Sequence, residues 1–219
     1  HTTYLLREAI SYSCQRGQTV FVSFLDARKA FDCIWTDGLF FKLYELGIDG
    51  KLWRLLRKWY GNFTCRVRIG NTLSEPFQIL QGVFQGGKWS MRLFQVYHDL
   101  ITSITESRLG SNIYSIRVPC PTYADDLAII SPYAKTQQKL LNQVYKFANT
   151  WRITFNASKS ATMTFKNGKP MEPSKIPTTY LGDVAIPSCN FYEHLGVGIG
   201  TEEDITAKML AKGKSSFYS

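Results

Sequence analysis

The sequence predicts an α+β fold, in which an antiparallel sheet is covered by helices largely on one face. This class is favoured because strand-like and helical patterns follow one another in mixed order. Of the 219 residues, 44% are apolar, as in a folded globular chain. By its length, the chain is expected to form one large domain or one and a half small ones. A folded chain of this length buries roughly 70% of its extended surface. The composition excludes a disordered or a collagen-like chain.

The first elements expected are a helix and a buried strand. Apolar residues recur at helical spacing over Tyr4–Cys14, and Gly17 ends the pattern. The β-branched and aromatic run Thr19–Leu25 then predicts a buried central strand that delivers Asp26 at its end.

Two short amphipathic helices and a hairpin come next. The helices are expected at Asp37–Leu46 and Lys51–Tyr60, each followed by a glycine that suits a helix C-cap. Phe63–Ile69 alternates as a strand does, Gly70 and Asn71 form the turn, and Phe77–Leu80 is the expected return strand.

The middle of the chain combines a glycine-rich loop with a hairpin. Gln81–Gly87 is the loop, and it opens a long helix predicted over Trp89–Ile104. Ile113–Val118 is expected to be a strand, and Thr122–Ile130 reads as an apolar hairpin whose turn holds two carboxylates.

The last third of the chain predicts a long helix followed by strands. Tyr133–Trp151 is amphipathic, Ala161–Phe165 is a strand, and the proline-rich segment Lys169–Pro177 crosses the surface. Tyr192–Ile199 is expected to be a final strand before a helical tail.

The net charge favours a polyanionic partner. The chain has 26 Lys and Arg against 17 Asp and Glu, a net charge of +9, and nucleic acid is the partner such a charge suits best. Five basic residues gather within a short stretch that also contains the aromatic residues Tyr60 and Phe63: Arg54, Arg57, Lys58, Arg66 and Arg68. Such a mixture can bind bases and sugars, and the alternative is a solvated helix face that keeps the protein soluble.

The cysteines and the apolar runs indicate in which cellular compartment the protein is expected. The five cysteines are widely spaced without a CxxC pair, so we expect neither a zinc site nor a disulfide framework, and a reducing nuclear or cytoplasmic compartment rather than secretion. No apolar run reaches the ~18 residues of a membrane span. The chain begins at His1 without a leader pattern, which predicts a piece of a longer protein.

Three acids stand where apolar strands end or turn. Asp26 follows the first buried strand, and Asp125 and Asp126 lie in the middle of the apolar hairpin. Neighbouring carboxylates raise one another's pKa unless a cation neutralises them. Mg²⁺ prefers oxygen ligands, and two such ions support nucleotidyl transfer. The alternative is that Asp125 and Asp126 belong to a solvated turn.

These residues carry a resemblance to a known family. Residues 24–32 (FLDARKAFD), 82–87 (GVFQGG) and 123–126 (YADD) resemble the core motifs of reverse transcriptases, in the same order and at similar spacing. Trp151, Asn156 and Lys159 resemble the next palm motif, and residues 194–197 (HLGV) the motif of the primer-grip hairpin. The string KAFD at 29–32 and the segment LGIDG at 46–50 are most similar to the enzymes of non-LTR retrotransposons.

The resemblance implies a role for eight residues. Asp26 and Asp125 would bind the metal ions, with Asp126 adjoining, and the Ala27 carbonyl would face the nucleotide. Phe31 would exclude the 2′-hydroxyl of a ribonucleotide, with plain core packing as the alternative. Gln85 and Gly86 would contact the incoming nucleotide, and Lys159 would protonate the departing pyrophosphate unless it is only a surface lysine.

The sequence also departs from the family pattern. Met91 and Arg92 follow Ser90 where the family has proline, and Phe84 stands where a basic residue or proline is common. Because proline pre-organises a first helical turn, its loss predicts a looser loop and a shifted helix start. The fingertips and the thumb of the family precede and follow the region that residues 1–219 match, so we expect only the polymerase palm and the inner part of the fingers here.

The resemblance therefore implies an RNA-directed DNA polymerase that uses two Mg²⁺ ions, with Mn²⁺ as a possible substitute, to join a dNTP to a primer 3′-hydroxyl. Its partners would be a template-primer of RNA or DNA and dNTP, without a membrane. Two alternatives stay open: a truncated, inactive retroelement remnant that only binds nucleic acid, and a palm-fold nucleotide cyclase, which has no need of Gln85 and Gly86.

Overall fold

The computed structural model describes residues 2–84, 86–156, 158–201 and 203–207. These residues form two compact units. The first unit comprises the described residues within 1–27, 100–148 and 154–219, and the second comprises those within 28–99 and 149–153. The units are described separately below.

A five-stranded antiparallel sheet is the centre of the first unit, with the strand order β11-β10-β1-β9-β8. Its strands are β1 (Val20–Asp26), β8 (Thr122–Tyr123), β9 (Asp126–Ser131), β10 (Ala161–Lys166) and β11 (Lys169–Pro170). The predicted buried strand is β1. It lies between β9 and β10 in the sheet, and its residues are buried on both faces. The α+β class and the antiparallel sheet are thus confirmed.

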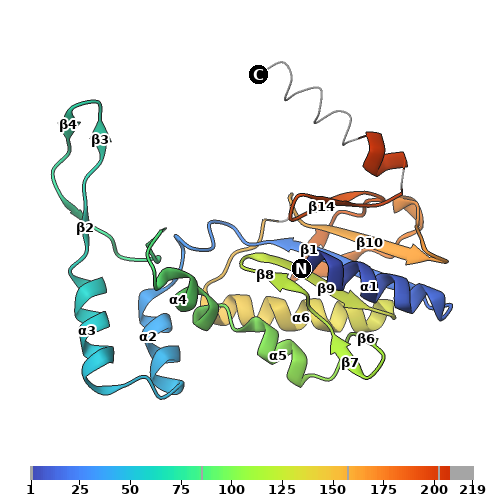
Figure 1. The fold of residues 1–219 in the computed structure, drawn as a ribbon, viewed down its shortest axis with the longest axis horizontal. Helices are drawn as coiled ribbons and strands as arrows, with labels where there is room; N and C mark the ends of the chain where they lie inside the picture. Colours follow the sequence, from blue (N-terminus) through green and yellow to red (C-terminus); the bar gives the residue numbers. More distant parts are fainter. Residues whose placement is uncertain (1, 85, 157, 202, 208–219) are drawn as a thin grey trace. The chain divides into compact units, whose positions relative to one another are not determined.

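Residues of alternating parity on β1 and β9 enter two separate cores. On one face Val22, Phe24 and Ala128 pack with α1 (Thr2–Gln15). On the other face Leu25 and Ile129 pack with α5 (Leu100–Glu106) and α6 (Ala134–Trp151). In Figure 1, α6 runs below β1 and β9, and β14 lies above them. Each fully buried Leu, Ile or Phe contributes about 1.5–3 kcal/mol, so the two strands are fixed from both sides.

A buried chain of hydrogen bonds ties α6 to the sheet. The Gln137 Nε2 group donates to the Ser23 hydroxyl at 2.8 Å and to the Ile129 carbonyl at 3.0 Å. The Ser23 hydroxyl lies 3.1 Å from that of Thr162, which lies 2.8 Å from that of Thr179. Because buried polar groups are costly without partners, these bonds select one register of β1 against α6 and β10.

Besides the hairpin of β10 and β11, four hairpins lie in the described part of the first unit, and three of them differ from the expectations. The sequence predicts one strand at Ile113–Val118 and another at Tyr192–Ile199, but each segment folds back on itself. The hairpins are β6 (Ser111–Ile113) with β7 (Ile116–Val118), β12 (Thr179–Leu181) with β13 (Val184–Ile186), β14 (Tyr192–His194) with β15 (Val197–Ile199), and the predicted β8 with β9. The predicted surface crossing contains β11 and a 3-10 turn at Pro173–Lys175. Of the predicted helical tail, residues 203–207 are helical and 208–219 lie outside the described residues.

As far as the structure describes it, the second unit contains three helices, two small pairs of strands and the glycine-rich loop. The helices α2 (Thr36–Glu45) and α3 (Gly50–Gly61) match their predictions within one or two residues. Two pairs of short strands follow: β2 (Thr64–Cys65) with β5 (Phe77–Gln78), and β3 (Arg68–Ile69) with β4 (Thr72–Leu73). The predicted helix at Trp89–Ile104 is wrong as one element, because α4 (Ser90–Tyr97) ends before His98 and α5 begins at Leu100.

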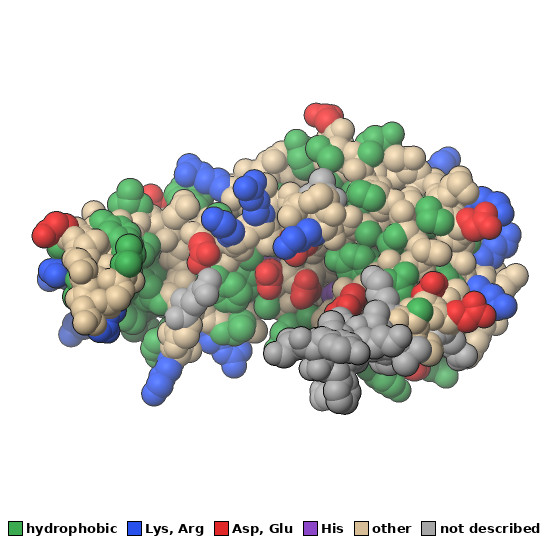
Figure 2. All heavy atoms as spheres, turned by 90° about the horizontal axis from the view of Figure 1, so that it is seen from above, with side chains coloured by type: hydrophobic (Ala, Val, Ile, Leu, Met, Phe, Trp, Pro, Cys, Tyr) green, Lys and Arg blue, Asp and Glu red, His purple; other side chains and the backbone are tan. Residues whose placement is uncertain are grey.

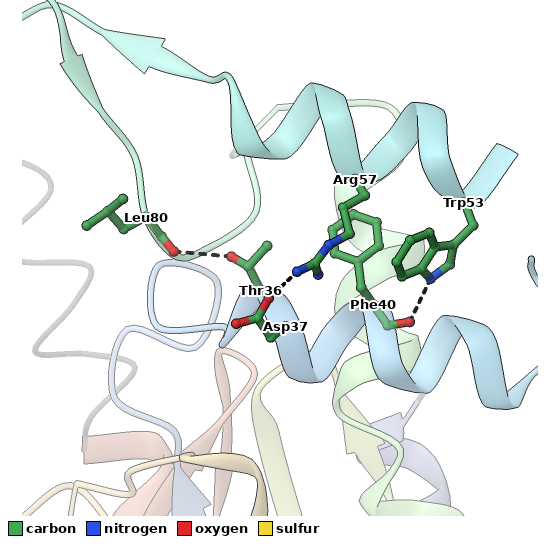
Figure 3. A network of polar contacts seen from close by, with 6 residues as sticks. All are labelled: Thr36, Asp37, Phe40, Trp53, Arg57 and Leu80. Atoms are coloured by element: carbon green, nitrogen blue, oxygen red, sulfur yellow. Dashed lines mark hydrogen bonds and ion pairs between the residues drawn. The ribbon is translucent and has the colours of Figure 1, made fainter. Parts of the chain in front are cut away.

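The α2–α3 pair is held by one polar network, which Figure 3 shows from close by. The Arg57 guanidinium on α3 donates to the Asp37 carboxylate at 2.6 Å and lies 5.4 Å from the centre of the Phe40 ring. The Trp53 indole donates to the Phe40 carbonyl at 2.9 Å. Arg57 was a candidate for nucleic-acid binding, and this geometry engages it in packing the two helices.

Candidate active site

Two of the predicted acids lie opposite each other on neighbouring strands. Asp26 ends β1 and Asp126 begins β9, and the two residues are register partners. Asp125 directly precedes Asp126 in the connection between β8 and β9. Asp26 has the parity of Val22 and Phe24, so the two partners share the sheet face that α1 covers. We call the three residues Asp26, Asp125 and Asp126 the carboxylate edge.

The turn that holds Asp125 has a conformation that non-glycine residues rarely adopt. Tyr123 pairs with Asp126, so Ala124 and Asp125 alone connect the strands. Ala124 has a φ of 52°, in the left-handed region, which costs a non-glycine residue about 1–2 kcal/mol. Two-residue hairpin turns commonly require this conformation, and here it sets the position of Asp125 next to Asp126.

The carboxylate edge is electrostatically unfavourable in the absence of a cation. Partial burial raises the pKa of Asp126, and the negative charges of Asp125 and Asp26 raise it further. A divalent cation would relieve this repulsion, and the carboxylate oxygens are the ligands that Mg²⁺ prefers. Within the described residues, no three His, Cys, Asp or Glu side chains lie ready to hold a metal ion together. The three acids supply oxygen donors of the kind that Mg²⁺ prefers, and such ions commonly take further ligands from substrate phosphates.

The main chain next to Asp26 is tied to the segment that contains Lys159. The Asn156 amide donates to the Asp26 carbonyl at 2.8 Å, and Ala27 forms an antiparallel bridge with Phe155. The amides of Lys159 and Ser160 donate to the Asn156 carbonyl at 3.1 and 3.0 Å, closing a turn. Lys159 is exposed on this turn. The structure thus brings Ala27 and the Lys159 turn to the end of β1 that bears Asp26.

Tyr192 is a residue of this region that the sequence reasoning missed. Its ring stacks on Phe24, with ring centres 4.2 Å apart and planes 9° apart, and its hydroxyl donates to the Lys159 carbonyl at 3.1 Å. Burial raises the pKa of Tyr192 to about 12, with further contributions from the charges of Asp126 and Asp26. His194, two residues later, is buried and tilted against the same Phe24 ring. The only available signal was the HLGV motif, which marked this hairpin without pointing to the tyrosine.

In the second unit, the candidate Phe31 is joined to the glycine-rich loop. The Phe31 ring stacks on Phe94 of α4, with centres 4.2 Å apart, and the Phe31 carbonyl accepts a hydrogen bond from the Val83 amide at 2.9 Å. Gly82 has a φ of 90°, and a Cβ there would lie 2.8 Å from the Asp32 carbonyl oxygen. Only glycine fits this close approach. Gly86 is exposed with a φ of 83°, and Gln85 lies outside the described residues.

Phe84, one of the departures from the family pattern, is the anchor of the loop. Its ring centre lies 3.6 Å from that of Phe63, 5.0 Å from that of Tyr60 and 5.9 Å from that of Trp59. Aromatic pairs of this kind contribute about 0.5–1.5 kcal/mol each beyond their burial. The helix α4 begins at Ser90, within one residue of the start predicted at Trp89, and the expected shift relative to the family stays a prediction.

The basic stretch is exposed in large part. Arg54, Lys58, Arg66 and Arg68 are exposed, and exposed apolar residues of α3 such as Leu55 and Trp59 lie among them in sequence. Figure 2 shows Lys and Arg side chains in blue and hydrophobic side chains in green mixed on the face it displays. Such a surface suits a polyanion with stacked bases. None of the helices in the described part of the chain has the length and hydropathy of a membrane span.

Comparisons with known proteins agree with this geometry. The family model described as reverse transcriptase (RNA-dependent DNA polymerase) matches residues 3–185. Among curated relatives, the RNA-directed DNA polymerase from mobile element jockey of Drosophila melanogaster is 28% identical over 187 residues, covering 80% of this chain and 19% of the relative. A Pol polyprotein from the type-1 retrotransposable element R2 of Popillia japonica is 27% identical and covers 84% of this chain and 26% of the relative. The chain thus spans about a fifth of the length of the jockey polymerase.

Solved structures show the same fold at low sequence identity. Apo telomerase from Candida tropicalis, truncated from its C-terminal domain, has a TM-score of 0.61 at 12% identity, covering 91% of this chain and 38% of that one. Telomerase of the same organism in complex with an RNA fragment gives a TM-score of 0.58 at 11% identity, covering 81% and 33%. Because the family model matches most of this chain, the chain belongs to the reverse transcriptase family.

Proposed function

We propose that this chain is the palm and inner-fingers region of a non-LTR retrotransposon reverse transcriptase, which extends a primer with dNTPs on an RNA or DNA template. The observation that carries the proposal is the register pairing of Asp26 with Asp126, with Asp125 in the adjoining turn. This pairing gathers acids that are about a hundred residues apart in the chain, at an edge where a cation relieves their repulsion.

In the proposed reaction, the primer 3′-oxygen attacks the α-phosphorus of the dNTP, and the bond to the bridging oxygen breaks to release pyrophosphate. Asp26 and Asp125 would hold two Mg²⁺ ions, with Asp126 adjoining, and the ions would supply charge neutralisation at the reacting phosphate. The Ala27 main chain and the glycine-rich loop would orient the nucleotide. Lys159 would give a proton to the departing pyrophosphate.

The roles of Phe31, Gln85 and Gly86 belong to the same proposal. Phe31 would lie under the sugar and exclude a 2′-hydroxyl, and Gln85 and Gly86 would contact the incoming nucleotide. The fixed connection between Phe31 and Val83 supports a joint role, because it couples the ring to the loop through the main chain. The basic residues Arg54 and Lys58 would contribute to template binding through phosphate contacts.

The test is primer extension by the complete protein that carries this chain, with Asp125→Asn as the variant and Asp183→Asn as the matched control. Asp183 lies in the exposed turn between β12 and β13, so its replacement changes the same charge elsewhere. We expect Asp125→Asn to abolish extension and to leave salt-dependent binding of template-primer intact. Extension at the unaltered rate would remove Asp125 from its role, and a wild type that binds without extending would identify an inactive remnant.

A further inference from the structure

Tyr192 joins three parts of the first unit that are distant in sequence. It begins the β14–β15 hairpin, its ring packs on Phe24 of β1, and its hydroxyl reaches the main chain of the Lys159 turn. Phe24 is two residues before Asp26 in the chain and lies on the same sheet face. A side chain with an aromatic body and one directed hydroxyl is suited to fix a turn against a strand.

Around the residue that receives this hydrogen bond, the described residues 156 and 158–160 are tied to one another and to β1. The amides of Lys159 and Ser160 bond to Asn156 within the turn, and Asn156 bonds to the Asp26 carbonyl at its beginning. The Ser160 hydroxyl donates to the Asn156 carbonyl at 2.9 Å and lies 3.4 Å from the Asp26 amide. These bonds fix the two ends of the turn to β1. The Tyr192 hydroxyl adds a bond at Lys159, the residue whose side chain has the proposed chemical role.

We propose that Tyr192 is a positioning residue, which acts by holding the Lys159 backbone so that the Lys159 side chain is kept at the carboxylate edge. The proposal rests on the function proposed above for Lys159. It goes beyond that function because it assigns a role in the chemical step to the β14–β15 hairpin, through a hydroxyl that does not touch the nucleotide. Tyr192→Phe removes that hydroxyl and keeps the ring on Phe24.

The first experiment measures the turn without reference to activity. Amide hydrogen exchange is compared between wild type and Tyr192→Phe, with Tyr180→Phe, which changes an exposed side chain of β12, as the matched control. Losing a neutral hydrogen bond corresponds to a change of about 3- to 10-fold in a local equilibrium. We expect the Lys159 and Ser160 amides to exchange about 3- to 10-fold faster in Tyr192→Phe alone. Unchanged exchange at these two amides overturns the proposal, whatever the activity.

The second experiment is a double-mutant cycle on single-turnover primer extension, with Tyr192→Phe and Lys159→Ala in the complete protein. We expect Tyr192→Phe to lower the rate of the chemical step by about 3- to 10-fold, without a change in the KM for dNTP, and to have no effect when Lys159 is already alanine. Effects that multiply show that Tyr192 acts independently of Lys159 and overturn the proposal. If the wild type does not extend primers, the proposed function fails, and the exchange experiment still decides whether Tyr192 holds the turn.

Discussion

Replacing Asp126 by asparagine should make the protein more stable at neutral pH while impairing its proposed chemistry. Asp126 faces Asp26 across two paired strands and adjoins Asp125, and the pKa of Asp126 is raised by burial and by both charges. Asparagine has nearly the same shape and no charge. The substitution therefore removes the repulsion without opening a cavity.

The expected gain follows from the geometry of the strand pair. Side chains of directly opposed residues lie about 5 Å apart, where two unit charges repel by about 0.8 kcal/mol in water and about 3 kcal/mol at an effective dielectric constant near 20. Asp126 is only partly buried, so solvent screening favours the lower value. We expect Asp126→Asn to raise the free energy of unfolding by about 1 kcal/mol at pH 7.

The pH dependence gives the sign of the effect. A carboxyl whose pKa is higher in the folded state destabilises the fold when it is ionised, so the penalty is absent below the pKa of an unfolded Asp, about 3.9, and grows as the pH rises through the folded pKa. Urea unfolding at pH 4 and pH 7 measures the difference, with Asp183→Asn as the control that should change stability by less than about 0.5 kcal/mol. Added Mg²⁺ should stabilise the wild type more than Asp126→Asn. An asparagine variant that gains nothing at pH 7, or gains equally at both pH values, would refute the reasoning.

Two further predictions concern the second unit. Phe84→Ala should destabilise it by about 2–3 kcal/mol, because it removes a ring packed against three others; chemical unfolding monitored by tryptophan fluorescence measures this, and Phe84→Leu, which keeps apolar volume, should lose less than half as much. Phe31→Ala should admit ribonucleotides in primer extension by the complete protein, read as the ratio of kcat/KM for dNTP and rNTP; an unchanged ratio would leave the ring as a packing residue on Phe94.

The central strands and the long helices could be predicted because their buried residues recur in the sequence with the spacing of a strand or a helix. The run before Asp26 is buried at every position and apolar at all but Ser23, as a strand covered on both faces requires, and α6 repeats its buried residues at helical spacing. Asp26, Asp125 and Asp126 could be singled out because each ends or interrupts an apolar run. What the sequence could not provide is the pairing partner, since register depends on contacts between distant segments such as Ser23 with Gln137.

The hairpins β6–β7 and β14–β15 were read as single strands for a definite reason. Their two-residue connections place Tyr114 and Leu195 at positive φ, 52° and 51°, where turns ordinarily have asparagine or glycine. The apolar residues around the turns continue the strand alternation, so the sequence indicates only weakly that each segment contains a turn. The same misreading hid Tyr192, because only the folded hairpin brings its ring onto Phe24.

The long helix predicted over residues 89–104 failed for a different reason. Phe94 and Tyr97 are buried on α4, and Leu100 and Ile104 are buried on α5, so one apolar period runs through both helices. No glycine or proline marks the break at His98, which is buried. The break lies where the chain passes from one compact unit to the other, a property of the tertiary structure that local periodicity does not contain.

The position of the acids follows from the balance between charge and burial. Leu127, Ala128, Ile129 and Ile130 on β9 are almost completely inaccessible, and an unpaired carboxylate among them would cost far more than the about 1 kcal/mol estimated at the strand end. Each buried Leu or Ile contributes about 1.5–3 kcal/mol, so the interior of the two strands outweighs the repulsion at their ends. A sheet of this kind can hold clustered acids only where its strands reach solvent, which is also where a cation and a polyanionic substrate can approach. The requirement for stability and the requirement for the proposed chemistry thus select the same edge of the sheet.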